Sequence, residues 1–119
     1  MQAEAMYRKA LELNEALGRK EGIAGAYGNL GIVYQSRGDL TQAEAMHRKA
    51  LELDEVLGKK EGMADDYGNL GIVYQSRGDL TQAEAMYRKA LVLFQEVDAT
   101  SQAGQVQELL RSLRGQGSP

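Results

Sequence analysis

The apolar and small residues of this chain recur every three or four positions, the spacing at which side chains share one face of an α-helix. The stripe that follows Thr41 comprises Ala43, Met46, His47, Ala50, Leu51, Leu53 and Leu57. No segment shows the alternation expected of a strand. The pattern predicts an all-α chain with helices at about 2–17, 21–37, 41–57, 61–77, 81–97 and 101–114, and a frayed tail over 115–119.

Glycine and threonine residues mark the expected helix ends. Gly38 can take the left-handed conformation that closes a helix, and Gly58 closes the next one. Thr41 and Thr81 are the expected N-caps, because each is followed three residues later by a glutamate, Glu44 or Glu84, as in a capping box.

The chain repeats itself with a period of forty residues. Residues 2–41 and 42–81 differ only at Tyr7/His47, Asn14/Asp54, Ala16/Val56, Arg19/Lys59, Ile23/Met63, Gly25/Asp65 and Ala26/Asp66. A third copy starts at Gln82 and continues to about Leu91. Such a period is typical of repeat proteins, whose units bury their apolar faces against one another. We therefore expect one repeat domain over residues 1–119.

The two ends of the chain differ. The sequence starts inside a unit, because Met1 stands where Thr41 stands in the next copy, so the first helix has no upstream partner. Its apolar stripe predicts a homodimer through residues 1–17. The last helix keeps an apolar stripe of Val106, Leu109, Leu110 and Leu113. Its other positions replace Tyr67, Gly68, Gly71 and Tyr74 with Gln107, Glu108, Arg111 and Arg114, which predicts a capping helix.

A pair of glycines recurs at the same places inside the predicted helices 21–37 and 61–77, where each glycine costs roughly 0.5–1 kcal/mol relative to alanine. They are Gly28 and Gly31 in one copy and Gly68 and Gly71 in the next. We expect a neighbouring helix to approach closely there, with the glycine opposite a bulky Tyr34, Tyr74 or Tyr87. A phosphate-binding loop is disfavoured, because the sequence GIAGAYG fits neither glycine-rich motif for phosphate.

The residues at fixed places in each unit resemble the tetratricopeptide repeat. These are Tyr27, the sequence NLG, Tyr34, Gly38, Ala43, an aromatic at Tyr7 or Tyr87, and Ala50. The resemblance covers residues 2–97 and is closest to the long variety of Pins-type adaptors and kinesin light chains. Glu55 and its neighbours lack the proline that often ends the second helix. The resemblance implies antiparallel helix pairs stacked as a right-handed superhelix, with peptide or protein partners.

Composition offers little material for catalysis. The chain has no cysteine and one histidine, and its net charge of −3 argues against a nucleic-acid or anionic-membrane partner. No apolar run is long enough to cross a membrane and no signal peptide is visible, so a cytoplasmic location is expected. We expect no enzyme activity, cofactor or metal. His47 occupies the place of Tyr7 and Tyr87, which indicates a packing role rather than a base or a metal ligand.

In the resembled family, the first helix of each pair lines the concave side that binds peptides. The residues pointing away from the packing face are then Gly25, Asn29, Ile32, Gln35 and Ser36, followed by Asp65, Asn69, Ile72, Gln75 and Ser76. The asparagines are the sharpest candidates, because a carboxamide both donates and accepts hydrogen bonds. They either bind the main chain of an extended peptide, as the resemblance implies, or bond a neighbouring helix and stiffen the stack.

The predicted function is therefore a non-enzymatic scaffold that binds an extended peptide or partner protein on its concave face. The groove lacks clustered Lys and Arg, and Asp65 and Asp66 would repel a carboxylate, so a basic or neutral segment is favoured. The alternative is a self-assembly module that dimerises or stacks end to end through its repeat surfaces.

Overall fold

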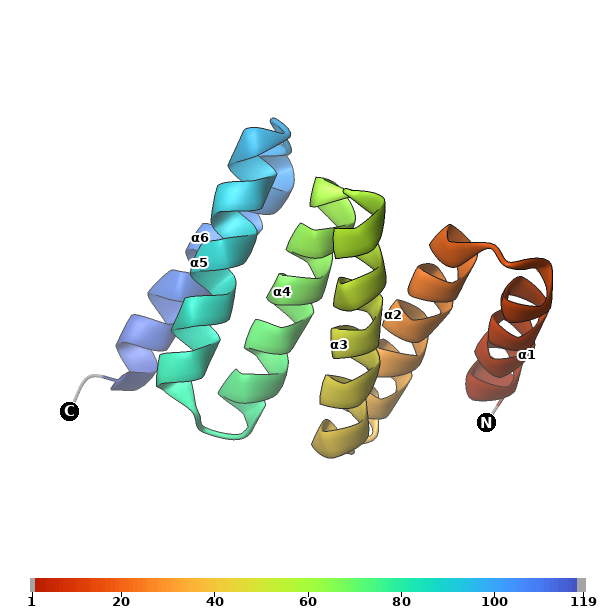
Figure 1. The fold of residues 1–119 in the computed structure, drawn as a ribbon. Coiled ribbons are helices and arrows are strands. Elements are labelled where there is room, and N and C mark those ends of the chain that lie inside the picture. Colours follow the sequence, from red (N-terminus) through yellow and green to blue (C-terminus); the bar gives the residue numbers. More distant parts are fainter. Residues whose placement is uncertain (1, 118–119) are drawn as a thin grey trace. The chain divides into compact units, whose positions relative to one another are not determined.

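Helices account for nearly all of the chain in the computed structural model, which describes residues 2–117. In chain order they are α1 (Gln2–Leu17), α2 (Lys20–Ser36), α3 (Leu40–Leu57), α4 (Lys60–Ser76), α5 (Leu80–Glu96) and α6 (Thr100–Gly117). The described residues contain no strand, so the all-α prediction is confirmed. Successive helices run antiparallel within each part of the chain (Figure 1). Helix α6 continues past the predicted end at residue 114, and residues 118–119 of the predicted tail lie outside the described residues.

The chain divides into two compact units, Met1–Lys59 and Lys60–Pro119. The first unit contains α1, α2 and α3, and the second contains α4, α5 and α6. In each unit the middle helix packs against both of its neighbours in sequence. The interpretation of the chain as one repeat domain stays a prediction.

Left-handed glycines end the helices as predicted. Gly38 and Gly78 have φ of 79° and 81°, and Gly58, at the end of α3, has φ of 69°. The Gly58 N–H donates to the carbonyl of Glu55, and the next N–H donates to the carbonyl of Asp54. These bonds occupy carbonyls that the end of the helix would otherwise leave unpaired.

The predicted capping boxes are wrong by two residues. Helix α3 begins at Leu40, and the carboxylate of Asp39 accepts the Gln42 N–H at 3.3 Å. Asp79 caps α5 in the same way through Gln82, at 3.2 Å. Thr41 therefore lies inside the first turn, since the chain enters the helix immediately after the left-handed glycine.

This assignment of the cap makes a stability prediction. Replacing Asp39 with alanine leaves an N–H of the first turn without its acceptor and should lower the free energy of unfolding by about 1 kcal/mol. Replacing Thr41 with alanine should change it by no more than about 0.5 kcal/mol, since its side chain does not cap. Urea denaturation of both variants measures these changes in the free energy of unfolding. A larger loss for Thr41→Ala than for Asp39→Ala would mean that Thr41 caps the helix, as the sequence predicted.

Small residues let the helices of a pair approach closely. Ala43 and Ala50 of α3 are fully buried, as are Ala83 and Ala90 of α5. The bulkier apolar core residues are Leu30, Val33, Tyr34 and Leu51 in the first unit, and Leu70, Val73, Tyr74, Tyr87 and Phe94 in α4 and α5 of the second. Helix α6 contributes Val106, Leu110 and Leu113, while Gln107, Glu108, Arg111 and Arg114 are exposed. Helix α6 thus has one packed side and one exposed side, although Leu109 of the predicted stripe is only half-buried, and its role as a capping helix stays a prediction.

Only one glycine of each predicted pair lies at a helix contact. A Cβ on Gly31 would stand 2.5 Å from Cε1 of His47, and one on Gly71 would stand 2.5 Å from Cδ1 of Tyr87. Gly28 and Gly68 have no such neighbour in their own units, so the prediction of a close contact is wrong for them there. The partner ring comes from the following helix, whereas Tyr34 and Tyr74, which the sequence also offered, lie on the same helices as the glycines.

Candidate functional site

An exposed stripe of small, polar and apolar side chains runs along α2. It consists of Gly25, Asn29, Ile32 and Ser36, all exposed, and is called the α2 face below. Ile32 keeps 48% of its surface exposed, which is high for a side chain of its size. The Asn29 carboxamide makes no hydrogen bond with the described residues of its unit. The structure thus brings these predicted residues together on one side of the helix.

The corresponding residues of α4 are Asp65, Asn69, Ile72 and Ser76, called the α4 face below. Asp65 and Ser76 are exposed, whereas Asn69 and Ile72 are half-buried. As in α2, the asparagine carboxamide makes no hydrogen bond with the described residues of its unit. Asp66, which the sequence placed beside Asp65 in the groove, is instead buried, with 5% of its surface exposed. Of these two aspartates, only Asp65 is exposed.

The two predicted glutamines hold the helix pairs together. The carbonyl oxygen of Gln75 accepts a hydrogen bond from the Tyr87 hydroxyl at 2.7 Å, and its Nε2 donates to Gln116 at 2.5 Å. In the first unit, Oε1 of Gln35 lies 3.4 Å from Nε2 of His47. Both glutamines are half-buried. The sequence did not reveal this role, although the repeated separation of twelve residues to the ring was a usable signal.

His47 is fully buried against Gly31 in the place that Tyr87 takes in the second unit. Burial lowers the pKa of His47 from 6.5 to about 4, because the apolar surroundings disfavour the charged ring. Its Nδ1 has no hydrogen-bond partner among the described residues. The ring is therefore neutral near pH 7 and fills space between two helices, as the sequence predicted.

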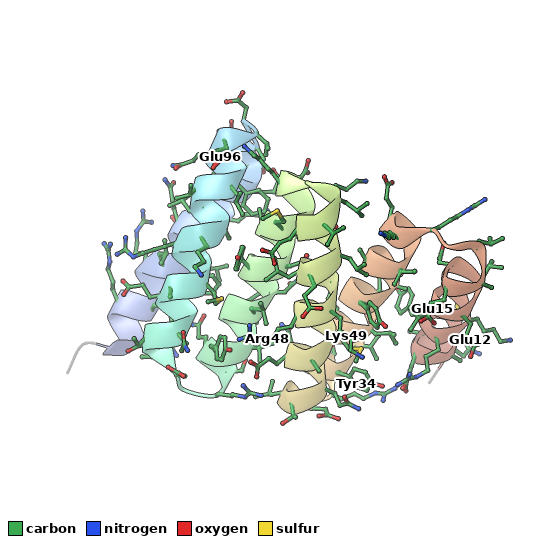
Figure 2. The ribbon with its side chains drawn as sticks, in the orientation of Figure 1. Glu12, Glu15, Tyr34, Arg48, Lys49 and Glu96 are labelled. Carbon is green, nitrogen blue, oxygen red and sulfur yellow. The ribbon has the colours of Figure 1, made fainter. Side chains whose placement is uncertain are left out.

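A group of four polar side chains fastens α1 to α2, and sequence reasoning missed it. The Glu4 carboxylate accepts hydrogen bonds from Arg37 at 2.7 Å, from the Tyr34 hydroxyl at 2.8 Å and from Arg8 at 3.0 Å. Tyr34 lies at the end of α2 beside the start of α1 (Figure 2). Bonds from Arg37, Tyr34 and Arg8 lower the pKa of Glu4 from 4.5 to about 2. Only the Glu4–Arg8 spacing was visible in the sequence as a helical pair.

The part of the chain that the structure describes contains neither a candidate metal site nor a candidate transmembrane helix. Within residues 2–117, no three His, Cys, Asp or Glu side chains lie close enough to hold a metal ion together. Every helix described there is too short or too polar for a transmembrane segment.

Comparison with known proteins supports a repeat protein. The family model described as "Tetratricopeptide repeat" matches residues 1–55 and 22–96. No curated protein matches the chain. Among solved structures, the crystal structure of BtubC (BKLC) from P. vanneervenii is similar, with a TM-score of 0.67 and 20% sequence identity. The match covers 98% of this chain but 57% of that one, so it supports the fold alone.

Proposed function

Since the chain belongs to the tetratricopeptide-repeat family, we propose that it is a scaffold that binds an extended peptide or partner protein on the α2 face and the α4 face. Repeats of this family generally mediate protein–protein interaction and are not catalytic. The family match therefore also supports a non-enzymatic role. The proposed ligand-contacting residues are Asn29, Ile32, Asp65, Asn69 and Ile72, with Gln35 and Gln75 at the edge.

The observation that carries this proposal is the exposed, unbonded carboxamide of Asn29. A carboxamide can donate to a main-chain carbonyl and accept from a main-chain N–H of the same extended segment. Gly25, one turn earlier, has no side chain to hold that segment away, and no atom lies within 4 Å of where its Cβ would be. Ile32, one turn later, offers apolar surface to a ligand side chain. Together they suit a segment that lies along the helix.

The charges on these faces favour a neutral or basic segment. Neither face contains lysine or arginine, so a carboxylate would find no cation there. Asp65 is exposed on the α4 face at the position of Gly25. A lysine or arginine of the ligand near this position would gain charge-assisted hydrogen bonds. Gln35 and Gln75 already bond within the fold, so we assign them an orienting role beside the ligand.

The proposal predicts that both asparagines contribute to affinity and not to stability. An extended peptide selected from a displayed library of neutral and basic sequences serves as the probe. The double variant Asn29→Ala, Asn69→Ala should bind it about tenfold more weakly, the effect of one or two lost hydrogen bonds. The free energy of unfolding should change by no more than about 0.5 kcal/mol, because neither carboxamide bonds within its unit.

Fluorescence anisotropy measures the affinity, and urea denaturation measures the stability. Glu52→Ala, on the exposed side of α3, is the matched control and should bind the peptide as the parent does. Unchanged affinity in the double variant would contradict the proposed face. If the double variant loses stability and keeps its affinity, the asparagines stabilise the packing of the helices and do not bind the peptide.

A second candidate function is self-association through α1. Met6, Leu13 and Leu17 keep 67%, 60% and 54% of their surfaces exposed, and no residue of α1 is buried. Exposed apolar side chains on one helix favour association. None of these residues belongs to the α2 face or the α4 face, so the asparagine variants should leave such association unchanged.

A further inference from the structure

Helices α4 and α5 leave an apolar groove between them on the surface of the second unit. Its volume is about 410 Å³, which suits a small organic ligand. Val92 keeps 54% of its surface exposed there, and the other apolar side chains are half-buried. The groove, called the α4–α5 groove below, is lined by Met63 and Tyr67 of α4 and by Arg88, Lys89, Val92 and Leu93 of α5.

Lys89 places a positive charge at this apolar surface. Its Nζ lies 5.3 Å from the centroid of the Tyr67 ring, a cation–π contact that holds the ammonium group beside the groove. The residues three and four positions from Lys89 along α5 are uncharged, so no carboxylate of the same helix face pairs with it. Arg88 adds a second cation, which bonds Glu84 at 3.1 Å in an exposed ion pair. No aspartate or glutamate of the described residues lines the groove, so its charge is positive.

We propose that the α4–α5 groove binds a small organic acid with an apolar body, an aryl or alkyl carboxylate. The body packs on Met63, Val92 and Leu93, and the carboxylate accepts charge-assisted hydrogen bonds from Lys89. Because the Tyr67 ring already holds the ammonium group, less side-chain freedom is lost when the acid binds. A neutral apolar ligand would instead desolvate the ammonium group without giving it a partner.

This site is distinct from the proposed peptide site. None of the residues that line the groove belongs to the α2 face or the α4 face, so the inference does not rest on peptide binding.

The first unit has the same residues at the corresponding positions, with one change of charge. Lys49 lies over the Tyr27 ring at the same distance, 5.3 Å. Glu52, however, stands at the position of Val92, three residues from Lys49 on the same side of α3. A carboxylate there repels an organic acid and competes with it for the ammonium group. We therefore expect the acid to bind the second unit and not the first. The full set in the first unit is Ile23, Tyr27, Arg48, Lys49, Glu52 and Leu53.

Naphthoate tests the proposal, with its neutral amide, naphthamide, as the matched ligand. Titration of the intact protein, followed by two-dimensional NMR, measures the affinity and shows which backbone amides shift. Naphthoate should shift the amides of the α4–α5 groove and bind at least about tenfold more tightly than naphthamide. Lys89→Met removes the charge and keeps the length of the side chain, so it should abolish this difference. Lys49→Met, the same change in the first unit, should leave the difference intact.

Two further variants exchange the residue that distinguishes the two units. Val92→Glu should weaken naphthoate binding at least about tenfold, because a carboxylate then faces the acid. Glu52→Val should add a second site, seen as shifts of amides in α2 and α3. Urea denaturation checks that each variant remains folded.

Three results would overturn the proposal. The first is equal affinity for naphthoate and naphthamide, and the second is an equal loss of affinity in Lys89→Met and Lys49→Met. The third is a set of naphthoate-induced shifts confined to α1, the α2 face or the α4 face, which would assign the acid to another surface.

Discussion

Replacing Gly31 with alanine is expected to lower the free energy of unfolding by about 1–3 kcal/mol, as overpacking of a close contact does. The same change at Gly28, three residues earlier in α2, is expected to raise it by about 0.5–1 kcal/mol. Both positions are helical, so alanine has the same propensity advantage at each. What differs is the space above the backbone. A Cβ at Gly31 would stand 2.5 Å from the His47 ring, and one at Gly28 would meet nothing within 4 Å in its unit.

The ring cannot move away without cost. His47 is fully buried, and its Nε2 lies 3.4 Å from Oε1 of Gln35, so displacement would open a gap or strain that contact. Gly71→Ala should behave like Gly31→Ala, because Tyr87 is equally buried and its hydroxyl bonds Gln75. Leucine at either position should cost at least as much as alanine. Urea denaturation of the parent and of the three alanine variants gives the unfolding free energies needed.

Opposite signs at the two positions of α2 are the result that supports a close helix contact. If Gly31→Ala is as stabilising as Gly28→Ala, the helices of the pair separate easily and the glycine has no packing role. Equal destabilisation at both positions would mean instead that Gly28 meets a neighbour that the first unit does not contain.

The repeat made the positions of the helices predictable from the sequence. The contacts between glycines and aromatic or histidine rings were not predictable in the same way. Periodicity placed every helix to within a few residues, because apolar stripes and left-handed glycines are local signals. Which glycine meets which ring depends on how two helices cross, and this is not local. Gly28 and Gly31 therefore looked equivalent in the sequence, although only the second faces His47.

The candidate site was predictable to a similar extent. The spacing of Gly25, Asn29 and Ile32 was enough to place them on one exposed side of α2. Gln35 has the same spacing, yet its carboxamide lies near His47, because it is close to the helix contact. The Glu4–Tyr34–Arg37 group was missed for the same reason, since it joins residues about thirty apart. The sequence is thus sufficient to predict which residues share an exposed helix face. The hydrogen bonds between helices can be assigned only once the packing of the helices is known.

The second large effect concerns pH. The contribution of His47 by itself is expected to lower the free energy of unfolding as the pH falls from about 7 to 5. The pKa of this buried histidine is lowered from 6.5 to about 4. Between these values the unfolded chain binds a proton that the folded protein does not. The free energy of unfolding therefore falls as the pH is lowered through this window. The expected loss is about 2 kcal/mol near pH 5, approaching about 3 kcal/mol below pH 4.

His47→Tyr is the matched control, because tyrosine occupies the equivalent place in the second unit, where its hydroxyl bonds Gln75. This variant should be at least as stable as the parent near pH 7 and should lack the histidine contribution below it. Carboxylates titrate in both proteins, so the difference between their unfolding free energies at each pH isolates position 47. Tyr87→His should add a second loss of the same sign, since its ring would be buried against Gly71.

Urea denaturation at several pH values gives the test. A difference between the parent and His47→Tyr that widens as the pH falls from 7 to 5 is expected from a histidine held neutral by burial. A constant difference would show that the ring keeps its ordinary pKa in the folded protein, and hence that water reaches it. A difference that narrows at low pH would mean that the charged ring is stabilised by the fold. Gln35, whose carbonyl oxygen can accept from Nε2, would then be the first residue to substitute, since it is the polar group nearest that nitrogen.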